Sequence, residues 1–277
     1  MTSQIPWTRI FPDTDHRWIM GLRQGDLGAY FADRDTTGAV RAERRRWFAD
    51  EPEKYAVLLP EAEAGIRETC ELARTLGAPL GPSVSDLHEQ LLELGQAWEP
   101  DLVWMHPGAD GVHHLVGGAV CFPSSWSLLE MLGRPMSEVH ELVPGLNAAL
   151  ARQIETFLGK LSPGVAWQRE NWGLSRDGNF NHHPSRPRSR LDATVTIDEL
   201  WIRLEHQLLL KLPRSGSVLF GIRLEIVPFA EMLTDLQAAQ RLGRLIATMT
   251  STAADYKDLA AARPALLAMI AQATSAS

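Results

Sequence analysis

Two long segments in which polar and apolar residues alternate, joined by a short turn, constrain the fold of this chain more than any other feature. Residues 200–210 and 217–227 have the two-residue period of a β-strand, because successive side chains of a strand point to opposite faces of a sheet. The intervening Pro213-Arg214-Ser215-Gly216 has the composition of a turn. The pattern therefore predicts an antiparallel hairpin.

Further strands and helices are indicated on either side of this hairpin. Short apolar runs predict two strands at 101–105 and 115–122, separated by a turn, and another strand at 165–174. Apolar residues at helical spacing predict helices at 61–76, 87–98, 125–132, 146–161, 229–246 and 259–270. We expect Ser85 to cap the second of these helices, and Pro264 to kink or break the last one.

The order of these elements predicts the fold class. A hairpin, a helical crossover and three antiparallel strands follow one another, as in a PAS domain, with a ligand cleft between the sheet and the crossover helices. We therefore expect an α+β fold, with a PAS-like antiparallel sheet and a helical crossover flanked by N- and C-terminal helices. An N-terminal helical region, the PAS-like core and the C-terminal helices would pack as one compact unit, at 1–99, 100–228 and 229–277.

The charge of the chain limits its partners. Lys and Arg number 27 against 34 Asp and Glu, giving a net charge of −7, which argues against general affinity for nucleic acid or an anionic membrane. No apolar run approaches the ~20 residues of a membrane-spanning helix, and no secretory signal is evident. Two cysteines are too few for a disulfide framework. We expect a cytoplasmic protein in which the basic cluster at 41–46 is a solvated helix face.

Four motifs in order give the chain a family resemblance. They are RWIMGLR at 17–23, GGAVCFPSSWSLLEMLGRPMSEVHELVPGLN at 117–147, RENWGLS at 169–175 and RLEHQLLLKLPRSGSVLFGIR at 203–223. With them the chain resembles the DUF3445 family, named for the α subunit of haem-dependent oxidative N-demethylase. The resemblance implies a core that holds a b-type haem and an oxygenase that uses O₂ to remove a methyl group from a small amine, releasing formaldehyde. It also implies a separate flavin and iron–sulfur reductase as the electron donor.

Three positions depart from the family pattern. Met131 stands where Lys is usual, His206 stands where Arg is usual, and Leu224-Glu225 replaces a Thr-Tyr pair. We expect these departures to affect the choice of amine more than the fold.

A haem needs an axial ligand, an apolar slot and partners for its propionates. His140 is the first candidate for the iron ligand, because it directly precedes the helix at 146–161 and falls on the Ile-His-x-x-Val-Pro motif of the family. Capping a loop is its alternative role. Weaker candidates are one of the adjacent His113 and His114, and Cys121, which is more typical of an inert buried residue.

Two further groups of histidines are expected to be structural. His182 and His183 lie in a loop rich in Pro and Arg, which we expect to be exposed, with a substrate lid as the alternative. His206 lies on the apolar side of its strand together with Ile202 and Leu204, and a hydrogen-bonded core position is favoured over iron ligation.

The polar side of the strand at 200–210 carries the candidate catalytic residues. Arg203, Glu205 and Gln207 share one face, which is either solvated or a satisfied network. In the second case Glu205 can pair with a cationic amine while Arg203 keeps it ionised. The residues that could bind the cofactor in the same cluster, by propionate contacts or aromatic stacking, are Arg169, Asn171, Trp126, Trp172 and Arg223.

Other functions remain open at this level. A PAS core without an output domain can be a haem or small-ligand sensor, and the cleft can hold a ligand other than haem. A hydrolase-type metal site is poorly supported, because no HxH or HExxH motif occurs.

Overall fold

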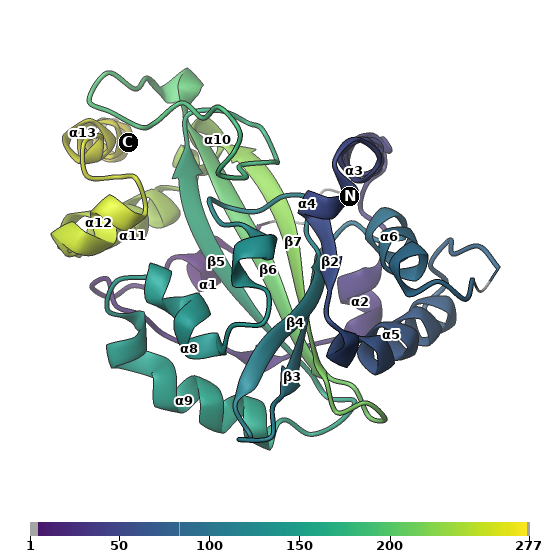
Figure 1. Ribbon diagram of the computed structural model, residues 1–277. Helices are drawn as coiled ribbons and strands as arrows, with labels where there is room; N and C mark the ends of the chain where they lie inside the picture. Colours follow the sequence, from purple (N-terminus) through teal and green to yellow (C-terminus); the bar gives the residue numbers. More distant parts are fainter. Residues whose placement is uncertain (1–4, 83, 276–277) are drawn as a thin grey trace.

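The computed structural model describes residues 5–82 and 84–275, which form a mixed helix and strand fold around a seven-stranded antiparallel sheet (Figure 1). The strand order is β1-β5-β6-β7-β3-β4-β2. The strands are β1 (Arg23–Gln24), β2 (Ala56–Leu58), β3 (Asp101–Pro107), β4 (His113–Ala119), β5 (Ala166–Ser175), β6 (Trp201–Lys211) and β7 (Val218–Pro228).

The helices precede, cross over and follow this sheet. The N-terminal ones are α1 (Trp7–Ile10), α2 (Leu27–Phe31), α3 (Ala39–Asp50), α4 (Pro52–Tyr55), α5 (Glu63–Thr75) and α6 (Leu87–Ala97). The crossover comprises α7 (Leu128–Met131), α8 (Met136–Val139), the 3₁₀-helix η2 (His140–Leu142) and α9 (Leu146–Lys160). The C-terminal ones are α10 (Phe229–Leu233), α11 (Leu236–Thr248), α12 (Ser251–Tyr256) and α13 (Arg263–Ser275).

The predicted hairpin is confirmed. β6 and β7 pair along their whole lengths, from Trp201 opposite Pro228 to Lys211 opposite Val218, and β6 also pairs with β5 over ten positions. The predicted strand pair at 101–122 and the crossover helix are also present, as β3–β4 and α9. The division of the chain into three regions stays a prediction.

The two outermost strands come from the N-terminal region, for which the sequence predicts only helices. β1 pairs with β5 through Arg23 and Gln24, and β2 pairs with β4 through residues 56–58. Strands this short display no two-residue period, so their pairing is decided by the neighbouring strand.

Two helix ends differ from expectation. Asp86 rather than Ser85 caps α6, because its carboxylate accepts the backbone N–H of Glu89. Pro264 is the second residue of α13, where its missing N–H has no intrahelical partner to lose, so it begins the helix instead of breaking it.

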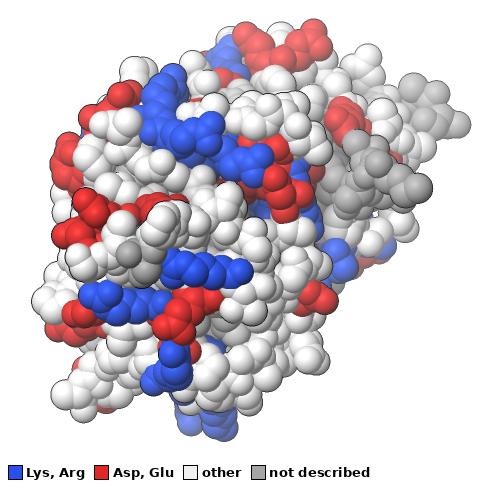
Figure 2. Space-filling view, turned by 90° about the vertical axis from the view of Figure 1, so that its right-hand side faces the viewer, with Lys and Arg blue, Asp and Glu red and all other residues white. Residues whose placement is uncertain are grey.

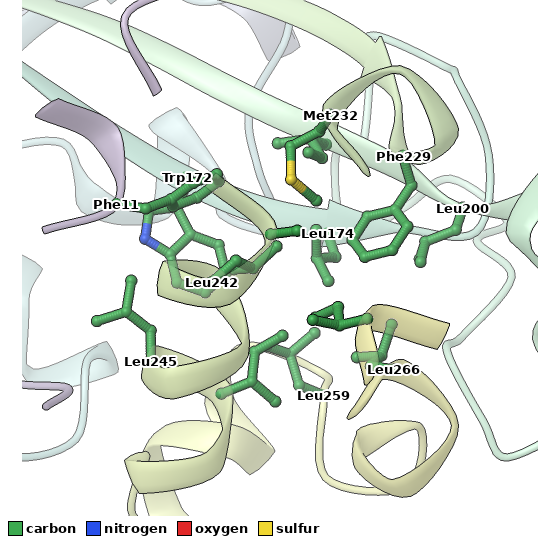
Figure 3. Close-up of a cluster of buried hydrophobic side chains, with 14 of the residues drawn as sticks. Phe11, Trp172, Leu174, Leu200, Phe229, Met232, Leu242, Leu245, Leu259 and Leu266 are labelled. Atoms are coloured by element: carbon green, nitrogen blue, oxygen red, sulfur yellow. The ribbon is translucent and has the colours of Figure 1, made fainter. Parts of the chain in front are cut away.

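The two faces of the sheet have different neighbours. On one face of β6, Ile202 and Leu204 lie in a cluster with the C-terminal helices and Leu208 lies in a cluster with α3, α5 and α6, whereas His206 is half-buried. Figure 3 shows the first cluster, in which side chains from α10, α11 and α13 meet those of β5. The crossover helices cover the opposite face, where Leu209 packs with Leu158 of α9.

The basic cluster at 41–46 is not a uniformly solvated helix face. Arg44 is fully buried, and its guanidinium donates to Asp101 Oδ1 at 2.6 Å and to the Gly95 carbonyl at 2.7 Å. Asp101 also accepts the backbone N–H groups of Cys121 and Phe122. The pair therefore joins α3, the end of α6 and the β3–β4 hairpin. Elsewhere on this side of the molecule, cationic and anionic side chains are interspersed (Figure 2).

In the described part of the chain, no helix has both the length and the apolar character needed to cross a membrane.

Replacing Arg44 by Met should lower the free energy of unfolding by about 3 kcal/mol, because Asp101 would keep a buried charge without a counter-ion. Urea denaturation followed by circular dichroism measures this change. Arg46→Met is the matched control on the same helix: Arg46 is half-exposed and should give a change below ~0.5 kcal/mol. Equal effects of the two substitutions would show that the Arg44–Asp101 pair does not stabilise the packing of α3 and α6 against the β3–β4 hairpin.

Candidate functional site

A cavity of about 590 Å³ lies between the sheet and the crossover helices. Its sheet side carries apolar side chains of β3, β6 and β7, and its helix side those of α8 and α9: Val103, Met105, Leu209, Phe220 and Ile222, facing Met136, Val139, Leu146, Leu150, Ile154, Phe157 and Leu158. This is the cleft that the element order predicts. Its size is in the range of pockets that hold cofactors and drug-sized ligands.

Segments far apart in sequence complete the wall. Trp18, Met20 and Leu22 line the cavity from the N-terminal region, and Tyr256 and Lys257 line it from the end of α12. Trp18 ties these parts together: its indole N–H donates to the Pro144 carbonyl at 2.9 Å, and its ring meets the Tyr256 ring edge-on.

Glu205 presents a carboxylate to the cavity from β6 and is held in place by two amides. Asn171 Nδ2 on β5 and Gln207 Nε2 on β6 donate to the same carboxylate oxygen, Oε2, at 3.1 and 2.8 Å. All three residues line the cavity. The polar face of β6 is thus a hydrogen-bonded network inside the protein, and the second carboxylate oxygen receives no side-chain hydrogen bond from the described residues.

Arg169 is a cation of the cavity that has no hydrogen-bond acceptor among the described residues. It lies on β5, and among the described side chains its Nε is buried without an acceptor. Burial lowers the pKa of Arg169, while the Glu205 and Glu170 carboxylates oppose that shift. A buried guanidinium without a partner favours an anionic ligand.

His140 lines the same cavity from η2, at the crossover. Burial, and then the charge of Arg169, lower the pKa of its imidazole below the usual value. The ring is therefore neutral at pH 7, which is the state that binds a metal. The side chain of His140 makes no capping hydrogen bond within the described residues, so the loop-capping role is not observed.

Arg203 also lines the cavity, but its hydrogen bonds go to the loop that follows β5. It donates to the Asn179 carbonyl at 2.6 Å and to the Phe180 carbonyl at 2.8 Å. Burial lowers its pKa to about 10, and the nearby Glu205 charge counteracts this. Arg203 therefore positions the 177–182 loop and acts on Glu205 only through its electrostatic field, since no ion pair joins them in the described structure.

The two candidate tryptophans differ. Trp126 lines the cavity and is not fully buried. Trp172 borders the cavity but packs edge-on against Phe11, as Figure 3 shows, with ring centroids 5.6 Å apart. The ammonium of Lys257 lies 4.5 Å from the Trp172 ring centroid. Trp172 thus makes a cation–π contact with a lysine of this chain.

Arg223 does not belong to the site, which corrects its assignment as a cofactor-binding residue. It lies on the other side of the sheet, ion-paired with Glu99 at 2.5 Å and bonded to the carbonyls of Tyr30 and Ala32. Like Arg203, it is an arginine near the middle of a long strand of the hairpin. Its neighbours in space, however, come from the ends of α2 and α6.

The weaker iron-ligand candidates lie outside the cavity wall. Cys121 is buried beside Arg44, and burial raises the pKa of its thiol, so the thiolate is disfavoured. His113 contacts Glu155 of α9, and His114 contacts the Gly133 carbonyl. His206 points to the opposite face of the sheet and binds Glu225 at 2.9 Å. The hydrogen bond agrees with its expected role, but the residue is half-buried and not in the core.

The loop with His182 and His183 is not exposed at these residues. Both are buried, at 5% and 7% exposure. His182 lines the cavity and hydrogen-bonds Asp177 at 3.0 Å. Burial and the charge of Arg203 lower its pKa, so its imidazole is neutral at pH 7.

Lys257 and Arg188 are cavity residues that sequence patterns do not reveal. Arg188 donates to Ser125 Oγ and, at 3.2 Å, to Asp258 Oδ2. Ser125 and Asp258 both have positive φ, at 70° and 59°, and both line the cavity. Such backbone strain is held by surrounding contacts and clusters at functional sites. The sequence around Ser125 and Asp258 does not predict their positive φ, apart from the general abundance of Ser and Asp in turns.

The departures from the family pattern divide between the two sides of the sheet. Met131 lines the cavity. His206 and Glu225, by contrast, bind one another on the far side, where the hydrogen bond from His206 lowers the pKa of the Glu225 carboxyl. Two of the three departures therefore contact each other, through His206 and Glu225. Only Met131 is placed to contact a ligand in the cavity.

The cavity fits the haem that the resemblance implies. It offers an apolar slot, a neutral imidazole at His140, and an unpaired guanidinium at Arg169 for a propionate. The Nε of Arg203 is a second buried donor without an acceptor among the described groups.

Comparison with known families gives one match. The family model described as haem-dependent oxidative N-demethylase, alpha subunit-like, matches residues 78–267. The match includes the crossover, β5–β7 and Lys257.

Arg203→Met should loosen the 177–182 loop, because the Asn179 and Phe180 carbonyls would lose their donor. We expect a loss of about 2 kcal/mol in unfolding free energy and faster proteolytic cleavage near this loop. Limited proteolysis with peptide mapping measures the second effect. Arg190→Met is the control, since Arg190 is 80% exposed; identical cleavage of both variants would exclude a positioning role for Arg203.

Proposed function

The chain belongs to the haem-dependent oxidative N-demethylase α-subunit-like family, and from this premise we propose that it is a haem-dependent oxidoreductase that removes a methyl group from a small amine. The observation that carries the proposal is that one cavity contains two complementary groups. The guanidinium of Arg169 has no acceptor among the described residues, and the carboxylate of Glu205 is fixed by two amides. The first suits a cofactor propionate and the second a cationic amine. The order β5-β6-β7-β3-β4 with its helical crossover supports a PAS-like core.

We propose that the cofactor is haem b, whose iron His140 would bind and whose propionate Arg169 would hold. Trp126 and Asn171 also line the cavity and would border the cofactor. When bound, haem would supply the activation of O₂ and the oxidation of the methyl group. Trp172 supports this region from the side, because its ring is already engaged by Phe11 and Lys257.

The protein's own residues bind and orient the amine. Glu205 would accept a hydrogen bond from the ammonium through the carboxylate oxygen that Asn171 and Gln207 leave free. The apolar side chains of α8 and α9 exclude water, which strengthens this ion pair. A methyl group on the same nitrogen then lies within the cavity, beside the apolar wall.

Two further parts of the proposal concern the surroundings of the protein. Electrons would come from a separate flavin and iron–sulfur reductase, as the family resemblance implies. The protein would work in the cytoplasm; both of its cysteines are free and buried, which suits a reducing compartment.

Haem titration tests the cofactor. The protein should show a Soret band on addition of haem, and His140→Ala should weaken haem affinity by ~100-fold or shift the band. His114→Ala is the control, because His114 lies outside the cavity. Since the pKa of His140 is lowered, binding should persist as the pH falls through 6.5 and weaken only at lower pH. Absence of a Soret band would overturn the proposal.

Formaldehyde release tests the reaction. With haem, O₂ and a reductant, the protein should release formaldehyde from a methylated amine, and Glu205→Gln should lower kcat/KM by roughly 30-fold, because the ammonium loses its counter-ion. Haem spectra of both proteins should match. Tight haem binding without turnover of any methylated amine would favour the sensor function instead.

A further inference from the structure

Lys257 is held in the cavity wall by neighbours that do not neutralise its charge. Its Nζ donates to the Trp172 carbonyl at 2.7 Å, at the edge of β5 that β1 leaves unpaired. Its ammonium faces the Trp172 ring at 4.5 Å and the Trp18 ring at 6.0 Å. No ion pair of Lys257 occurs among the described residues.

The surroundings of Lys257 lower the pKa of its amine. Glu205 on β6 stabilises its charged form through space, and Arg169 on β5 opposes it. On its own segment, the Tyr256 phenol has a pKa raised to about 12 and is neutral, and Asp258 is engaged by Arg188. Burial outweighs the effect of Glu205 and lowers the pKa of Lys257 to about 8.

We propose that Lys257 is a nucleophilic amine that forms a Schiff base with a small aldehyde in this cavity. Lysines placed in a desolvated pocket beside another cation are the ones that proteins use in this way. The choice of an aldehyde rests on the proposed function, because oxidative N-demethylation releases formaldehyde into the space that Lys257 lines.

The step balances without an oxidant or a metal. The Nζ lone pair of neutral Lys257 adds to the carbonyl carbon, and one N–H proton moves to the oxygen to give a carbinolamine. Loss of that hydroxyl with the remaining N–H proton releases one water and leaves an imine. Hydrolysis reverses the step and frees the aldehyde, so Lys257 would hold the product and retard its escape.

Reductive methylation measures the reactivity directly. The purified protein is treated briefly with formaldehyde and cyanoborohydride at pH 7, and methylation of each lysine is quantified by peptide mass spectrometry. The chain has four lysines: Lys54, Lys160, Lys211 and Lys257. Lys257 should be methylated at least ~10-fold faster than the exposed Lys160, since a larger fraction of its amine is neutral at pH 7. In denaturant the two rates should converge.

The pH dependence of labelling and two variants with opposite expected effects test the role of the lowered pKa. The rate at Lys257 should level off above pH ~8, while that at Lys160 keeps rising toward pH ~10. Glu205→Gln removes the carboxylate that stabilises the ammonium, so labelling at pH 7 should accelerate. Arg169→Met removes the opposing charge, so labelling should slow. Lys160 should be unchanged in both variants.

Three results would overturn the inference: labelling of Lys257 no faster than Lys160 in the folded protein, a response to the two variants opposite in sign, or complete protection of Lys257 by added haem. The last would make Lys257 a haem partner. The haem titration tests the proposed function independently of this labelling experiment, and a missing Soret band would contradict that function. Fast labelling without that band would leave the reactive amine established and remove demethylation as its aldehyde source.

Discussion

The two-residue period of β6 is the constraint on which the rest of the structure depends. Ile202, Leu204 and Leu208 are buried under the terminal helices, which commits Arg203 and Glu205 to the opposite face. A register shift of one residue would exchange the two sets and place charges in the apolar core. Pairing with β5 and β7 along nearly the whole strand prevents that shift. The polar wall of the cavity is thus a consequence of apolar burial on the far side.

The apolar crossover helices cover this polar wall and keep its charged groups away from water. Away from water, each group needs a partner inside the protein. Glu205 has two amides and Arg203 two backbone carbonyls, whereas Arg169 has no acceptor among the described residues. The same burial keeps the His140 imidazole neutral and lowers the pKa of Lys257. One desolvated space therefore contains an anion-seeking guanidinium, a fixed carboxylate, a potential metal ligand and a reactive amine.

The rest of the cavity wall is built from segments that are distant in the sequence. Trp18 links the N-terminal strand region to η2 and α12, and Arg188 links the 182–190 loop to two strained residues, Ser125 and Asp258. Strain at both partners of one arginine is stable only because the surrounding packing is extensive. On the far side, the departures His206 and Glu225 bind one another without touching the cavity. Sequence variation across the sheet therefore has different consequences on its two faces.

By itself the sequence determined the β6–β7 hairpin, the crossover helix and the polar row on β6, because each rests on spacing between residues close in the chain. His140 was indicated by its place before the crossover helix and by the family motif. The sequence left Arg223 among the candidates beside Arg203, because the two have the same chemistry on paired strands; the register places Arg223 opposite His206 and so on the far face, where Glu99 pairs with it. Lys257, His182, the burial of Arg44 and the short strands β1 and β2 were likewise decided only by tertiary structure. Their environments are created when the terminal regions dock on the sheet, and no local period encodes which distant groups will meet there.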